Sequence, residues 1–275
     1  YSQFLLARAR YYNGQDSTAA IHRSLKQIEQ DRSHALNLWQ YSFLFPKVVL
    51  NKFGRVHEGT IRSWRDPVVY QGKQTFAVKV LPGEEAIRFH LQHVKVGKYG
   101  NPLELKVVSP KGYLIHYEEV PADTKLDKVI PVTLKGTYLV IVDRAGFFRV
   151  EAENTLFSIK ANWFRPVLEA DKTITRYFYV PRGLESFATQ VAAGTGGDWT
   201  MRFIDPSGGV ALSKDDLLGT VKFNIKVPEK AQGKIWKLEV SGKISTRIRV
   251  LPPATMPWWF ASEPSRLIVP QQFLQ

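Results

Sequence analysis

The sequence predicts a mainly β protein with two tandem antiparallel β-sandwich domains of jelly-roll type, preceded by a short helical segment. Three observations support this prediction. Strands alternate apolar and polar side chains, turns rich in Pro, Gly and Asp separate them, and the same pattern recurs about a hundred residues later. Strict alternation bounded by turn residues is typical of half-buried antiparallel strands.

The alternation is clearest in the second half of the chain. A turn sequence, Asp-Pro-Ser-Gly-Gly at 205–209, follows the first of the strands expected there. Pro228 and Gly233 mark the next turn. The expected strands share the alternating pattern and cover residues 199–204, 223–227, 235–240 and 244–250.

Residues 103–150 repeat the order of strands and turns found in 199–250. The anchors that match between the copies are Pro82 with Pro181, Pro110 with Pro206, Gly136 with Gly233, and Val150 with Val250. Each pair is separated by about a hundred positions, far longer than the repeat of a solenoid. We infer an internal duplication of a globular domain. The alternative is two unrelated sandwiches that share turn chemistry.

The helical segment differs from the rest of the chain in its periodicity, because its apolar residues recur at three- and four-residue steps. Its apolar side needs a cover, either the following β domain or a domain that precedes it in a longer parent protein. The parts we predict are the helical segment 1–45, a connector 46–74, β-sandwiches at 75–160 and 164–251, and a Pro- and aromatic-rich tail 252–275.

The chain is basic, with 38 Lys and Arg against 25 Asp and Glu and a formal charge of +13. A polyanion is therefore a candidate partner. Because the basic residues are scattered along strands rather than grouped in runs, we expect no nucleic-acid binding and favour an anionic polysaccharide. The sequence contains no run of about twenty apolar residues, so we predict no membrane span. The absence of cysteine excludes disulfides and thiolate chemistry.

Residues 199–250 resemble the bacterial pre-peptidase C-terminal (PPC) type of β-sandwich. The features that resemble it are an alternating strand, Asp-Pro-Ser-Gly at 205–208, an acidic loop, a strand ending at Pro228 and a closing strand after Gly233. Residues 103–150 resemble it less, with Ser109 where Asp205 stands in the second copy. The resemblance implies an accessory module of a secreted multidomain hydrolase. Carbohydrate-binding jelly-roll modules share this architecture.

Sequence motifs of catalysis are missing, since neither a Gly-x-Ser-x-Gly nor a His-Glu-x-x-His pattern occurs. His90 and His93 are three residues apart, which on a strand places them on opposite faces. We therefore predict that the chain is not itself an enzyme. A sandwich-based lyase or glycosidase would need a cleft of converging side chains that the sequence does not predict.

The acidic loop after residue 204 is a candidate calcium site. Calcium takes several hard oxygen ligands, and Asp205, Asp215 and Asp216 are the donors available there. The alternative is an ordinary solvated turn.

The tryptophans fall into two groups. Trp199 and Trp236 alternate in phase with core residues and Trp39 belongs to the helical stripe, so we assign all three to the interior. Trp64, Trp163, Trp258 and Trp259 lie in connecting segments, with Phe260 beside the last two. They are candidates for a sugar-stacking platform. The alternative is that they hold the domains together, as large aromatic residues often do at interfaces.

These observations lead to one functional expectation. The chain would be a non-catalytic accessory region of a secreted or periplasmic bacterial hydrolase that degrades polysaccharide. It would bind glycan or brace a catalytic domain of the same parent chain. The alternative is a purely structural, secretion or protein-interaction module without a small ligand. Exposed tryptophans would favour glycan binding, and tryptophans buried between domains would favour the structural alternative.

Overall fold

The computed structural model divides by its internal contacts into two compact units, Tyr1–Pro46 and Lys47–Gln275. The structure describes residues of the second unit, and the helical segment predicted at 1–45 lies outside them. The described residues are 53–58, 68–95, 100–132, 134–144, 146–153, 155–160, 166–167, 173–193, 199–216, 219–242, 249–251, 256–257 and 259–274.

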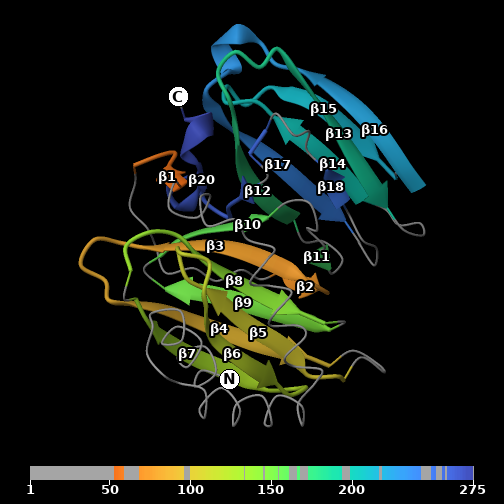
Figure 1. Ribbon diagram of the computed structural model, residues 1–275. Helices are drawn as coiled ribbons and strands as arrows, with labels where there is room; N and C mark the ends of the chain where they lie inside the picture. The colour runs from red at the N-terminus through yellow and green to blue at the C-terminus, as the bar shows by residue number, and fades with distance from the viewer. Residues whose placement is uncertain are drawn as a thin grey trace, which may run out of the picture. The chain divides into compact units, whose positions relative to one another are not determined.

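The described residues are mainly β, and their strands form several antiparallel sheets (Figure 1). A six-stranded sheet has the order β19-β10-β3-β8-β5-β6, and a five-stranded sheet has the order β11-β2-β9-β4-β7. We call β2 to β10 the first strand set. Its members are β2 (Val69–Gln71), β3 (Gln74–Val80), β4 (Ala86–Val94), β5 (Leu103–Val108), β6 (Leu114–Val120), β7 (Lys125–Pro131), β8 (Tyr138–Asp143), β9 (Phe147–Glu153) and β10 (Thr155–Lys160).

The second strand set, β12 to β18, contributes a four-stranded sheet of order β12-β17-β14-β15 and a three-stranded sheet of order β16-β13-β18. In Figure 1 its strands run from green through cyan to blue. The members are β12 (Thr173–Val180), β13 (Ser186–Ala193), β14 (Trp199–Ile204), β15 (Val210–Asp215), β16 (Gly219–Lys226), β17 (Lys234–Gly242) and β18 (Arg249–Leu251).

The strand order of the first set recurs in the second. Within the six-stranded sheet, β3-β8-β5-β6 matches β12-β17-β14-β15, and β9-β4-β7 of the five-stranded sheet matches β18-β13-β16. The hairpins β5–β6 and β14–β15 share an irregularity, a register shift between Val107 and Val108 and between Phe203 and Ile204. Gly112 and Gly208 follow these shifts with φ of 82° and 91°, a left-handed conformation that glycine adopts at little cost.

Strands outside the two sets connect distant parts of the chain. β1 (Phe53–Arg55) pairs with β20 (Ile268–Pro270), and β11 (Pro166–Val167) pairs with β2. β19 (Trp259–Phe260) is an edge strand beside β10. The 3₁₀ turns are η3 (Glu229–Ala231), η4 (Pro264–Arg266) and η5 (Gln271–Phe273).

Side chains at alternate strand positions form the hydrophobic core, as a period of two residues requires. In β14 the buried positions are Trp199, Met201 and Phe203, and in β17 they include Trp236 and Leu238. The sequence-based assignment of both tryptophans to the interior is confirmed. Among the described residues, no helix is long and apolar enough to cross a membrane.

Candidate functional site

Two charged side chains of β5 lie where the alternating pattern predicts solvent. Leu103, Leu105 and Val107 belong to the core, so Glu104 and Lys106 point to the other face of the sheet. Both are nevertheless buried, with exposed fractions of 3% and 1%. Buried charges are costly unless they are paired and hydrogen-bonded, so their partners define the site.

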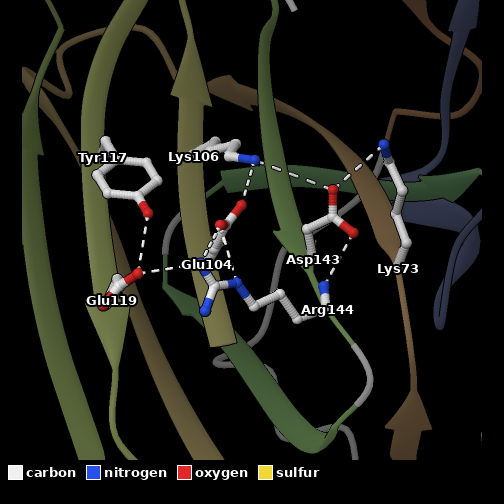
Figure 2. A network of polar contacts seen from close by, with 7 residues as sticks. All are labelled: Lys73, Glu104, Lys106, Tyr117, Glu119, Asp143 and Arg144. Atoms are coloured by element: carbon white, nitrogen blue, oxygen red, sulfur yellow. Dashed lines mark hydrogen bonds and ion pairs between the residues drawn. The ribbon is translucent and has the colours of Figure 1, made fainter. Parts of the chain in front are cut away.

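The partners of Glu104 are two cations. Lys106 forms an ion pair with the Glu104 carboxylate, and Arg144, just after β8, donates to Glu104 Oε1 from Nε at 2.8 Å and from Nη2 at 2.6 Å. Figure 2 shows both cations converging on this carboxylate. The double contact from Arg144 fixes the orientation of its guanidinium group, because the geometry of the group is rigid.

Asp143, the last residue of β8, extends the network. Its Oδ2 lies 3.3 Å from Lys73 Nζ and 3.9 Å from Lys106 Nζ, and its Oδ1 accepts a hydrogen bond from the backbone N–H of Arg144 at 2.8 Å. Arg144 has a φ of 82°, in the left-handed region that non-glycine residues seldom adopt. The hydrogen bond to Asp143 and the contacts with Glu104 hold Arg144 in this strained conformation.

The neighbouring edge strand β6 supplies Tyr117 and Glu119. The β5–β6 register places Glu119 opposite Glu104 and Tyr117 opposite Lys106. Glu119 Oε1 lies 3.1 Å from Arg144 Nη2 and accepts a 3.3 Å hydrogen bond from the Tyr117 hydroxyl. Lys106 Nζ lies 6.0 Å from the centre of the Tyr117 ring, within range of a cation–π interaction.

The network shifts the ionisation of its members. Burial opposes the charge on Glu104, but hydrogen bonds from Lys106 and Arg144 outweigh this and hold the pKa of its carboxyl below the usual value. Burial, followed by the charges of Glu104 and Glu119, raises the pKa of Tyr117. At neutral pH Glu104 is therefore ionised and Tyr117 is neutral.

The lowered pKa of Glu104 keeps its carboxylate ionised as the acceptor for Lys106 and Arg144. The rim of the network is accessible, since the side chains of Arg144 and Glu119 are 35% and 37% exposed. It presents a guanidinium donor and a carboxylate acceptor to a polar ligand.

Two residues of the predicted aromatic platform, Trp259 and Phe260, are among the described residues, and both are buried. Trp259 and Phe260 are only 8% and 3% exposed, because β19 pairs with β10. The Trp259 ring packs edge-on against Phe53 at 5.2 Å. Neither aromatic side chain has a face open to a sugar. Trp64, Trp163 and Trp258 lie outside the described residues.

The predicted calcium ligands do not converge. Asp205 follows β14, whereas Asp215 pairs with Thr200 near the start of that strand, so the two lie at opposite ends of the β14–β15 hairpin. Asp205 Oδ1 accepts hydrogen bonds from Ser207 and Gly209, and Asp216 Oδ1 accepts one from the N–H of Trp199. Among the described residues, no group of His, Cys, Asp or Glu side chains could hold a metal ion. Asp205 thus closes the turn after β14, and Asp216 bonds the first residue of that strand.

His90 and His93 lie on opposite faces of β4, as their spacing predicts. His93 is buried and its Nδ1 lies 3.2 Å from the carbonyl oxygen of Val120. His90 is half exposed between Asp127 of β7 and Glu153 of β9, with Nε2 3.1 Å from Glu153. The hydrogen bond with Asp127, followed by that with Glu153, raises the pKa of His90.

Sequence reasoning missed the ionic network. Glu104 and Lys106 occupy the polar positions of an alternating strand, which normally face water. The available signal was the pair of opposite charges two residues apart on β5, followed on β6 by Tyr117 and Glu119 with the same spacing. Such a pattern places polar groups on one face but says nothing about whether that face is covered.

The described residues define the fold class as mainly β, with several antiparallel sheets. No protein-family model and no curated protein match the chain. Among solved structures there is a likeness to the N-terminal CBM22-1-CBM22-2 tandem domain of Xyn10C from Paenibacillus barcinonensis, at 10% identity and a TM-score of 0.13. It covers 70% of this chain and 80% of that chain. This TM-score does not establish a common fold.

Proposed function

We propose that this chain is a non-catalytic accessory region of a secreted or periplasmic bacterial polysaccharide-degrading hydrolase. In this proposal the two strand sets are tandem β-sandwiches of one design. They hold a glycan-binding face in a fixed position relative to a catalytic domain of the same parent chain. The secreted parent and its catalytic domain rest on the sequence resemblance. The tandem arrangement is supported by the matching strand orders.

The observation that supports a fixed arrangement of the two strand sets, which we call the bracing role, is the position of residues 259–261. Trp259 and Phe260 form β19 beside β10 of the first strand set. The next residue, Ala261, exchanges backbone hydrogen bonds of 2.8 and 2.9 Å with Tyr177 of the second set. The Phe260 ring also lies 5.7 Å from that of Phe178. One short segment therefore contacts both sets through backbone and side chains.

A second link supports the same role. Arg176 of β12 donates a hydrogen bond from Nη2 to the Tyr70 hydroxyl of β2 at 2.7 Å. Tyr70 is 1% exposed and Arg176 is 4% exposed. A buried, charge-assisted hydrogen bond of this kind constrains orientation strongly.

Binding and bracing are tested on the whole chain. We expect retardation in affinity electrophoresis by an acidic polysaccharide, and the absence of retardation in a panel of acidic and neutral polysaccharides would contradict glycan binding.

We expect Phe260→Ala to lower the melting temperature and to separate the unfolding of the two sets into distinct calorimetric transitions. A single transition at the wild-type temperature would contradict the bracing role.

The second candidate function is a structural or protein-interaction module without a small ligand. The burial of Trp259 and Phe260 favours it, because both side chains serve packing. The two candidates differ in the electrophoresis experiment. A chain that shows the Phe260→Ala effect but binds no polysaccharide fits the structural module alone.

A further inference from the structure

The edge strand β6 carries an unusual surface for its position. Among the described residues, the exposed large apolar side chains are Tyr113, Ile115, Val129 and Val210, with exposed fractions of 55%, 42%, 60% and 55%. Tyr113 is the aromatic member of this group. It directly precedes β6, and Ile115 is two residues further along. An exposed aromatic side chain just before β6 and an exposed aliphatic one within it are therefore two residues apart.

The same strand leads into the ionic network. Tyr117 and Glu119 project from one side of β6, opposite Lys106 and Glu104 of β5, and Ile115 lies at the register shift that precedes them. Tyr117 and Glu119 lie beside Arg144 in Figure 2. At about 3.3 Å per residue, this row of residues from Tyr113 to Glu119 spans at most roughly 20 Å. This length can accommodate several sugar units of an extended chain.

Arg144 gives the row a polar end. Its Nε and Nη2 are hydrogen-bonded to Glu104, and Nη2 also contacts Glu119. Its Nη1 makes no hydrogen bond with any described residue, and the side chain is 35% exposed. The residue also has a strained φ of 82°. Backbone strain of this kind is concentrated at functional sites.

We propose that Tyr113, Ile115, Tyr117 and Arg144 form a binding strip for a carboxylate-bearing polysaccharide. The tyrosine and isoleucine side chains pack against the apolar faces of successive sugar rings. Arg144 Nη1 donates to a sugar carboxylate, the acceptor that best matches a guanidinium group. This inference rests on the proposed glycan-binding function and assigns it a site and a ligand class.

Charge complementarity favours this occupant over a neutral glycan. The chain carries a formal charge of +13, so a polyanion is attracted over long distances. The exposed Lys111 lies two residues before Tyr113 at the start of the row. A cation is thus present near each end of the strip. The carboxylates of the network, Glu104 and Glu119, are already engaged by Arg144.

The test compares the whole chain with single variants against polygalacturonate, using isothermal titration calorimetry and affinity electrophoresis. Tyr113→Ala removes the exposed aromatic side chain, and we expect a loss of affinity of about tenfold. Arg144→Gln removes the guanidinium group and should weaken binding similarly. Val210→Ala is the matched control, because Val210 is 55% exposed like Tyr113 but lies in the second strand set. It should bind as the wild type does.

Carboxyl-reduced polygalacturonate tests the ligand class with the same sugar backbone. We expect it to bind at least tenfold more weakly than the acidic polymer, and salt should weaken binding of the acidic polymer. Equal affinity for the two polymers would overturn the assignment to a carboxylate-bearing glycan.

Failure of the strip can be distinguished from failure of the proposed function. If the wild type binds polygalacturonate and Tyr113→Ala binds equally well, the strip is not the site, while glycan binding by the chain stands. If the wild type binds no polysaccharide of the wider panel, both proposals fail. Far-ultraviolet circular dichroism and melting curves for Tyr113→Ala and Arg144→Gln separate loss of contact from loss of fold.

Discussion

Ser109 and Asp205 occupy matching positions in the two strand sets and make the same hydrogen bond. Ser109 Oγ accepts from the backbone N–H of Tyr113 at 3.1 Å, and Asp205 Oδ1 accepts from that of Gly209 at 2.9 Å. Each acceptor thus bonds the N–H four residues later and closes the turn of its hairpin. Asp205 also accepts from Ser207. The two hairpins therefore share this local geometry although the two side chains differ chemically.

The first prediction concerns this turn. Asp205→Ala should lower the free energy of unfolding by about 1 kcal/mol, because local side-chain to backbone hydrogen bonds contribute about that much. Asp205→Ser, which copies Ser109, should lose less. Urea denaturation measures both changes, and Asp215→Ala on the exposed strand β15 is the control. Equal losses for Asp205→Ala and Asp215→Ala would contradict the capping role.

The contribution of Asp205 to the free energy of unfolding should depend on pH. The hydrogen bond from the Ser207 side chain, followed by those from the Gly209 and Ser207 N–H groups, holds the pKa of Asp205 below its usual 3.8. A lowered folded-state pKa stabilises the protein above the unfolded value, and the contribution is lost as pH falls through the folded value. The stability difference between wild type and Asp205→Asn should therefore shrink below pH 3.8.

The second prediction concerns the buried link between the strand sets. Tyr70→Phe removes the hydroxyl that accepts from Arg176 at 2.7 Å. We expect a loss of about 1 to 3 kcal/mol, as for a hydrogen bond to a charged group. Chemical denaturation measures it, with Tyr113→Phe as the control because Tyr113 is 55% exposed. A Tyr70→Phe variant as stable as this control would show that the link contributes nothing.

The third prediction concerns the ionic network. Glu104→Gln leaves Lys106 and Arg144 beside a neutral group, and we expect a loss of about 3 kcal/mol. The double variant Glu104→Gln with Lys106→Met should recover part of this loss, since removing both charges of a buried pair is often tolerated. The losses of Glu104→Gln and of Lys106→Met are also measured singly. If the double variant loses more stability than their sum, this coupling is contradicted.

The fourth prediction separates two histidines by their environments. The hydrogen bond with Asp127, followed by that with Glu153, raises the pKa of His90 above 6.5, whereas burial lowers that of His116 below it. Proton NMR titration of the whole chain should show His116 losing its proton first as pH rises. Asp127→Asn should lower the pKa of His90. The reverse order of titration would contradict the assigned contacts.

The raised pKa of His90 also predicts how its contribution to folding stability changes with pH. Because its folded-state pKa is raised, the contribution is fully present below 6.5 and is lost as pH rises through the folded value. His90→Gln should therefore differ most from the wild type in mildly acidic buffer, as measured by urea denaturation. A difference that grows toward alkaline pH would have the wrong sign.

Local sequence predicted the strands and turns well. The alternation in residues 199–204 and the turn that follows correspond to β14 and its hairpin, and Trp199 and Trp236 are in the core. These features depend on neighbours a few residues away, which a sequence pattern records. The matching turns are also marked in the sequence by glycine, and Gly112 and Gly208 both have a positive φ, of 82° and 91°.

Contacts between distant segments were not predictable in the same way. The tail at 252–260 is rich in Pro and aromatic residues, which left open whether its aromatic side chains are exposed or packed, and Trp259 and Phe260 in fact pair with β10, about a hundred residues earlier. Glu104 and Lys106 are buried although they occupy the polar positions of an alternating strand. In both cases tertiary contacts, and not local propensity, decide which face is covered.

The pairing of β10 with β19 and of β1 with β20 has a consequence for synthesis on the ribosome. The six-stranded sheet gains its outer strand only after Trp259 and Phe260 emerge, and Phe53 finds its partner Pro270 later still. Closing such long loops is slow relative to local pairing. A nascent chain would therefore hold its first sheet with an unpaired edge while the second set is made, and that edge is the point at which a chaperone would be needed.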